Sequence, residues 1–209
     1  MQIKRIAVLV SGRGSNLQTI IDNIENGSIN GSIEVVISSQ KEAYALERAR
    51  KHNVDGVYIG KGNFPDIDER NDKIIKLLAE KEIDLIVLAG YMNILNEKIV
   101  RLYRNRIINI HPSLIPSFCG RGFYGERVHK AVLDYGVKLT GATVHFVDEG
   151  ADTGPVIFQK AVEVDFDDTV ETLAKKVLKV EHKLLPLGVK FFCEDRLRVH
   201  GRRVEIDDK

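Results

Sequence analysis

The sequence has little of several features that would place it in a particular class. It contains two cysteines, Cys119 and Cys193, which are too few for a disulfide framework and favour a reducing, cytoplasmic setting. Its 31 basic and 30 acidic side chains leave a net charge of +1, so no overall field would gather nucleic acid or anionic membrane. No segment approaches the roughly 20 consecutive apolar residues of a membrane helix. The first apolar run, residues 6–10, is too short for a signal peptide.

Short apolar runs alternate with amphipathic segments along most of the chain. We predict strands at residues 6–10, 33–37, 57–59, 85–89 and 107–111, and helices at 15–24, 41–52, 66–80, 97–103, 125–134 and 169–192. This alternation indicates an α/β fold with a mostly parallel, twisted sheet flanked by helices. The loop between two later strands, 142–147 and 155–164, is too short for a crossover, so antiparallel strands are expected in the C-terminal half.

The length of the chain suits a single domain, residues 1–209. Near its end, Pro186 is expected to kink or break the last helix, because proline removes a helical hydrogen bond. Residues 197–206 are predicted to form a hairpin around Gly201.

The most informative stretch is Asn109–Pro116, which follows the apolar pair Ile107 and Ile108. Side chains alternate along a strand, so Asn109 and His111 point the same way at its C-terminal end. Ligands of open α/β sheets sit at that edge. An amide beside an imidazole can stabilise an oxyanion and handle a proton, which predicts a catalytic pair.

The first turn, residues 12–17, has two glycines before a helix. It lacks the third glycine and the later acidic residue of a dinucleotide-binding fingerprint, so we reject that function. Gly14, Ser15 and Asn16 could still hold a phosphate monoester at the helix N-terminus. An ordinary helix cap explains the same residues equally well.

Other candidate residues have simpler explanations. Residues 148–155 are acidic and rich in glycine, which suits a solvated loop, although one carboxylate could reach His111 and raise its pKa. His145 shares a strand face with Thr143 and is interpreted as structural, with a supporting role left open. The histidines show no paired spacing typical of zinc, so we expect no metal. Cys119 is interpreted as a bystander thiol, and spacing does not decide the role of Glu181.

Together these motifs resemble the formyl-folate-dependent transferases, and among them the glycinamide ribonucleotide formyltransferases of purine synthesis. The matching segments are residues 11–16, 87–92, 109–116, 141–147, 152–155 and 181–182, in the order found in the family. The pattern Asn-x-His-Pro-Ser-Leu-x-Pro is specific to the wider group, while the Gly-Ser-Asn turn points to this member. The resemblance implies a Rossmann-like formyltransferase fold, with ribonucleotide bound by the N-terminal half and folate by the C-terminal half.

The resemblance also implies a role for each matching residue. It implies that Asn109, His111 and Asp152 are catalytic. It further implies a phosphate-binding and ribose-binding set, which is Gly14, Ser15, Asn16 and Glu181. The pocket for the pterin of the co-substrate, 10-formyltetrahydrofolate, would include Met92, Asn93, Ile94, Leu95 and Asp148. Asn93, Leu178 and residues 119–125 differ from those usual in the family.

The mechanism that follows is direct attack of the glycinamide amine on the formyl carbon, with small-molecule substrates, no metal, and a monomeric or homodimeric protein. Three other functions are compatible with parts of this pattern. A hydrolase of 10-formyltetrahydrofolate would not need the phosphate turn. An initiator-tRNA formyltransferase should need a basic extension, which this near-neutral chain lacks. A nucleotide-binding module would leave Asn109, His111 and Asp152 without a use.

Overall fold

The computed structural model describes residues 2–207, and within them nine strands form one sheet of order β3-β2-β1-β4-β5-β6-β7-β9-β8. The strands are β1 (Lys4–Val10), β2 (Gly31–Ser38), β3 (Gly56–Tyr58), β4 (Leu85–Leu88), β5 (Ile107–His111), β6 (Leu139–Phe146), β7 (Val156–Glu163), β8 (Leu197–His200) and β9 (Arg203–Ile206). The first five strands pair in parallel, and β6 pairs antiparallel with both β5 and β7. The predicted α/β fold, with antiparallel strands in the C-terminal half, is confirmed.

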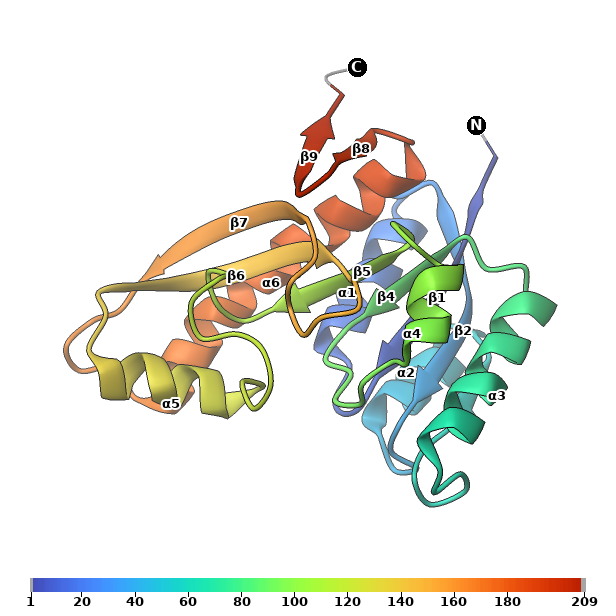
Figure 1. Cartoon of the computed structure of the whole chain (residues 1–209), viewed down its shortest axis with the longest axis horizontal. Coiled ribbons are helices and arrows are strands. Elements are labelled where there is room, and N and C mark those ends of the chain that lie inside the picture. Colours follow the sequence, from blue (N-terminus) through green and yellow to red (C-terminus); the bar gives the residue numbers. More distant parts are fainter. Residues whose placement is uncertain (1, 208–209) are drawn as a thin grey trace.

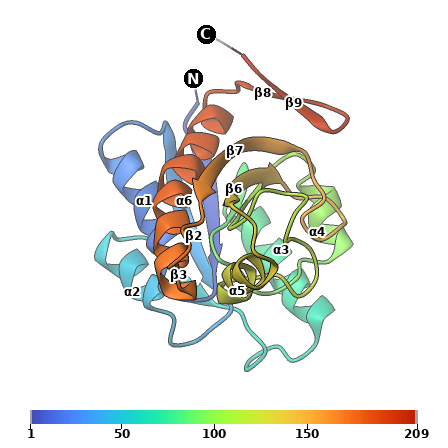
Figure 2. The same ribbon diagram turned by 90° about the vertical axis from the view of Figure 1, so that its left-hand side faces the viewer.

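Helices cover both faces of this sheet. They are α1 (Ser15–Glu25), α2 (Tyr44–Lys51), α3 (Ile67–Glu80), α4 (Glu97–Leu102), α5 (Glu126–Tyr135) and α6 (Val170–Cys193). Helices α1, α2 and α6 lie on one face of the sheet, and α3 and α4 lie on the other (Figures 1 and 2). The result is a three-layer arrangement in which the central strands are shielded from water on both sides.

The burial of the central strands explains why they read as continuous apolar runs. Residues 6–10 of β1 and all of β4 are buried. Alternate side chains enter two separate cores, so Ile6, Val8 and Val10 pack with α1 and α6, while Ala7 and Leu9 pack with α3 and α4. A strand buried on both faces cannot show the apolar–polar alternation of a half-exposed one.

The topology brings several strand ends to one edge of the sheet. The chain starts at β1, moves outward to β3, and then crosses back to β4 on the other side of β1, which makes the switch point where α/β proteins bind ligands. The β5 residue Asn109 lies opposite His145 of β6, and His111 lies opposite Thr143. Because β6 runs antiparallel to β5, the connection from β6 to β7 leaves beside Ile107 at the start of β5. Its residue Asp152 reaches back from there to the side chains of Asn109 and His111.

Two expectations about helices need correction. Pro186 lies inside α6, which nevertheless runs without a break from Val170 to Cys193. One missing hydrogen bond is tolerated because the surrounding turns bury Leu185 and Val189 against the sheet. Helix α2 begins at Tyr44 rather than at residue 41. No helix among residues 2–207 is both long and apolar enough to cross a membrane.

Candidate active site

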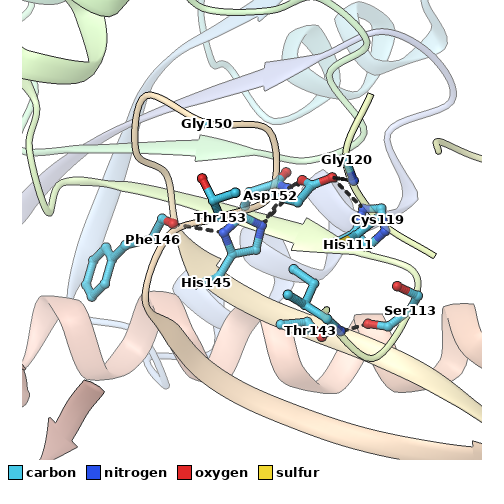
Figure 3. Close-up of polar contacts among 12 residues, drawn as sticks. His111, Ser113, Cys119, Gly120, Thr143, His145, Phe146, Gly150, Asp152 and Thr153 are labelled. Carbon is cyan, nitrogen blue, oxygen red and sulfur yellow. Dashed lines mark hydrogen bonds and ion pairs between the residues drawn. The ribbon is translucent and has the colours of Figure 1, made fainter. Parts of the chain in front are cut away.

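The structure brings Asn109, His111 and Asp152 together at the end of β5, although the third lies far away in the sequence. Figure 3 shows the carboxylate of Asp152 next to the ring of His111. The Nδ1 atom of His111 is 3.6 Å from Oδ2 of Asp152. The amide Nδ2 of Asn109 is 3.5 Å from Oδ1 of the same carboxylate. An amide donor, an imidazole and a carboxylate thus meet within a few ångströms, as a proton-transfer centre requires.

The carboxylate is held in place by an unusual backbone conformation and by a neighbouring loop. Asp152 has a φ of 57°, a left-handed conformation that aspartate tolerates better than most residues. The backbone N–H of Gly120 donates to Asp152 Oδ2 at 2.8 Å. Gly120 belongs to the loop between β5 and α5, so this bond ties the two loops together across the site. The predicted solvated loop is therefore a structured one.

His145 takes part in the same cluster, which the interpretation of a structural histidine did not specify. Its Nδ1 lies 2.8 Å from the carbonyl oxygen of Phe146, which can only accept, so Nδ1 carries the proton. In the neutral ring, Nε2 is then an acceptor, and Asn109 Nδ2 donates to it at 3.1 Å. His145 thereby fixes which way the amide of Asn109 points. The cross-strand pairing of the two residues was the signal that could have revealed this contact.

His111 is oriented by a similar contact. Its Nε2 is 3.0 Å from the carbonyl oxygen of Phe118 and must donate to it, so Nδ1 is the nitrogen that faces Asp152. Burial lowers the pKa of His111 and outweighs the negative charge of Asp152 and the bond to Phe118, which both raise it. The expected raised pKa of this histidine is therefore wrong in its net direction. The Asp152 carboxylate does raise the pKa of His111 as expected, but burial has the larger effect.

The pKa of Asp152 is lowered. Burial acts to raise it, but the nearby rings of His145 and His111 and the hydrogen bond from the N–H of Gly120 together outweigh that penalty. Asp152 is thus an ionised carboxylate at neutral pH, in a site where the imidazole beside it is mostly neutral. This combination suits a base that receives a proton from a reacting amine.

The glycine turn after β1 has the shape that an anion site at a helix N-terminus needs. Gly14 precedes α1 with a φ of 71° and no side chain caps the helix. A Cβ atom at Gly14 would lie 2.7 Å from the Cβ of Ala45, so only glycine fits. With the N-terminal N–H groups of α1 free of a side-chain cap, the turn keeps donors for a phosphate.

Glu181 lies next to this turn, 165 residues away along the chain from Asn16, whose Nδ2 donates to Glu181 Oε2 at 2.7 Å. Both side chains are buried, and Oδ1 of Asn16 has no partner among the described residues 2–207. Burial raises the pKa of Glu181, with the bond from Asn16 as a partial offset. A buried acid and an unpaired amide oxygen are groups that hydroxyls of a ligand could satisfy.

A cavity of about 600 Å³ lies beside the cluster of Asn109, His111 and Asp152. Its wall includes the loop after β4 and the loop between β6 and β7, with the predicted pocket residues Met92, Asn93, Ile94, Leu95 and Asp148 among its lining. Ser11 accepts a hydrogen bond from the N–H of Met92 at 2.8 Å, which joins the cavity wall to the glycine turn. Such a volume suits a drug-sized organic molecule.

Within residues 2–207 no group of three or more histidine, cysteine or acidic side chains is placed to hold a metal ion. The side chains of Asn109, His111 and Asp152 can donate and accept hydrogen bonds and transfer a proton.

Comparison with known proteins decides the family. Residues 4–189 match the Formyl transferase family. The chain is 38% identical to Phosphoribosylglycinamide formyltransferase of Haemophilus influenzae, with 99% of this chain and 95% of that protein covered. Glycinamide ribonucleotide transformylase 1 from Symbiobacterium toebii has a crystal structure with a TM-score of 0.93 and 42% identity, covering 99% of this chain and 95% of that chain. The chain belongs to the phosphoribosylglycinamide formyltransferase family.

This formyltransferase also shares its fold with a formyltetrahydrofolate deformylase from Pseudomonas syringae pv. tomato. The TM-score is 0.90 at 29% identity, with 99% of this chain and 67% of that chain covered. The resemblance inferred from the motifs is thus confirmed at the level of family and fold. The roles of individual residues in the formyltransferase stay predictions.

Proposed function

We propose that this protein transfers the formyl group of 10-formyltetrahydrofolate to the amine of glycinamide ribonucleotide in purine biosynthesis. The observation that carries the proposal is that Asn109, His111 and Asp152 lie together beside a large cavity. The wall of this cavity is hydrogen-bonded to the glycine turn after β1, which is suited to bind a phosphate. A transferase needs two binding regions around one reacting centre, and the cavity and the turn would serve as these two regions.

In the proposed reaction the amine nitrogen attacks the formyl carbon, a C–N bond forms, and the carbonyl electron pair moves to oxygen. The Nδ2–H of Asn109 and a protonated His111 stabilise the oxyanion. Burial keeps His111 mostly neutral in the empty site, so the arrival of negative charge favours its protonation. Asp152 accepts the amine proton. The oxyanion then re-forms the carbonyl as the bond from carbon to N10 of the folate breaks, and N10 takes up the proton that Asp152 received from the amine.

The ribonucleotide would bind through the glycine turn. The N–H groups at the turn, together with the side chains of Ser15 and Asn16, would hold its phosphate, and Glu181 would accept hydrogen bonds from the ribose hydroxyls. Met92, Asn93, Ile94, Leu95 and Asp148 would hold the pterin of the folate. A variant that carries both Ser15→Ala and Asn16→Ala should raise the KM for the ribonucleotide and spare the KM for the folate. An unchanged ribonucleotide KM would refute the phosphate site.

The second candidate is hydrolysis of 10-formyltetrahydrofolate, which the structural likeness to the deformylase favours. The turn argues against it, because water needs no phosphate-binding site. Folate release should be followed from 10-formyltetrahydrofolate with and without glycinamide ribonucleotide. The transferase proposal expects release only with the ribonucleotide, and release without it would mean that the protein is a hydrolase.

The remaining predictions concern the setting of the enzyme. A single domain over residues 1–209, a cytoplasmic location, and a monomer or homodimer that acts without metal, nucleic acid or membrane are the expected properties. The near-zero net charge supports small-molecule substrates over polyanions.

A further inference from the structure

The wall of the cavity carries an uneven set of charges. Its lining includes three carboxylates, those of Asp148, Glu149 and Asp152. The lining contains one arginine, Arg121, and no lysine. An arginine on the wall of a binding cavity is suited to a ligand carboxylate, because its fork of N–H donors matches two oxygens.

The carboxylates around Arg121 are already engaged. Asp148 accepts from the N–H of Gly150 at 3.1 Å and from the hydroxyl of Thr153 at 2.5 Å. Glu149 lies 3.8 Å from Arg101, and Asp152 is held by Gly120.

Arg121 itself is exposed, and no ion pair within 4.0 Å involves it among the described residues 2–207. Its guanidinium is therefore available to an anion from outside the chain.

The position of Arg121 fits one end of the proposed co-substrate. The backbone N–H of the preceding residue, Gly120, donates to the carboxylate of Asp152. The backbone of Arg121 therefore lies next to the reacting centre, and its long side chain starts from there. Apolar side chains at the cavity wall are exposed to solvent there, with Met92 53% and Ile94 66% accessible. In 10-formyltetrahydrofolate the reacting N10 is joined to an aminobenzoyl ring and then to glutamate. With the pterin held by Met92 and Ile94, the aminobenzoyl ring would carry the glutamate carboxylates out to the exposed rim of the cavity, where Arg121 lies.

We propose that Arg121 binds a glutamate carboxylate of the folate co-substrate and thereby selects folates that carry the glutamyl tail. The inference rests on the proposed function. Arg121 would contribute to co-substrate binding and not to the chemical step, so its effect should fall on the KM for folate while kcat stays the same.

The test compares two co-substrates that differ only in the charge of the tail, 10-formyltetrahydrofolate and its diamide, in which both glutamate carboxylates are neutral carboxamides. For Arg121→Ala we expect the KM for the folate to rise about tenfold, which corresponds to about 1.4 kcal/mol, and the KM for the diamide to stay the same. Arg121→Lys should fall between the wild type and Arg121→Ala, since it keeps the charge and loses the fork. Raising the salt concentration should weaken folate binding only in proteins with a cation at position 121.

The matched control is Arg127→Ala. Arg127 lies a few residues further on, stacks over the Tyr124 ring at 4.8 Å, and is absent from the cavity lining. It should change neither KM.

An Arg121→Ala variant that keeps the wild-type folate KM, or that weakens both co-substrates equally, would overturn the assignment of Arg121. Those outcomes leave formyl transfer itself intact. Failure of the wild type to use either co-substrate would refute the proposed function instead.

Discussion

His129 should make the stability of this protein strongly dependent on pH. The side chain lies in α5, is 4% exposed, and has an Nδ1 atom without a hydrogen-bond partner among residues 2–207. Burial, with a smaller contribution from the charge of His111, lowers the pKa of His129 from 6.5 to about 4. Below pH 6.5 the unfolded chain therefore binds a proton that the folded protein resists. The free energy of unfolding should fall as the pH drops from 6.5 toward 4.

The size of the effect follows from the shift. Between 6.5 and about 4, at about 1.4 kcal/mol per pH unit, His129 alone removes about 3 kcal/mol once both states are protonated. About 2 kcal/mol of this is lost between pH 7 and pH 5. The pKa of His111 is lowered as well, so its contribution has the same sign. A loss of this size is a large part of the 5–15 kcal/mol that stabilises a typical domain.

Urea unfolding of the wild type and of His129→Gln at pH 7, 6 and 5 tests this reasoning. The variant should be less stable than the wild type at pH 7, because a shorter side chain leaves a gap in the core. That penalty does not depend on pH, so the difference between the two proteins should shrink by about 2 kcal/mol toward pH 5. His200→Gln, at a side chain that is 60% exposed, is the matched control. Parallel losses in the wild type and His129→Gln would refute the buried, uncharged state of His129.

Three further changes test the site. Asn109→Ala should lower kcat about 10²–10³-fold with a modest change in KM, measured in a steady-state transfer assay, because a preorganised oxyanion donor is lost. Gly14→Ala should destabilise the fold by about 1–3 kcal/mol in urea unfolding and raise the ribonucleotide KM, because its φ is 71°. Gly12→Ala, whose added Cβ meets nothing within 4 Å, should do neither. Glu181→Gln should raise the Tm at pH 7.5, since burial disfavours the charged acid, while it weakens ribonucleotide binding.

Most of the fold could be predicted because its elements are local patterns. The buried strands are apolar throughout, and the short link between β6 and β7 excludes a crossover, so both the parallel core and the antiparallel half follow from spacing. The unbroken course of α6 through Pro186 was not predictable in the same way. Whether a helix survives a proline depends on how much neighbouring surface it buries, and that is a tertiary quantity.

The site was predictable in part, for a related reason. Asn109 and His111 share a face by strand alternation, so their proximity is a local property. The contacts of Asn16 with Glu181 and of Asn109 with His145 join segments that are distant in the sequence, and no residue spacing predicts them. The sign of the pKa shift at His111 was missed because it depends on burial, which competes with the charge of Asp152.

The position of the carboxylate depends on two loops more than on the strand that bears the imidazole. Asp152 has a left-handed backbone, its carboxylate accepts from Gly120, and the nearby Gly154 packs so closely that an added Cβ would lie 1.8 Å from the carbonyl oxygen of Phe146. Each of these features constrains the loop from a different direction. A small change in either loop would therefore alter the 3.6 Å separation from His111 without touching β5. Because proton transfer requires hydrogen-bond reach, a change at Gly120, the residue of the loop between β5 and α5 that holds the Asp152 carboxylate, should affect the chemical step.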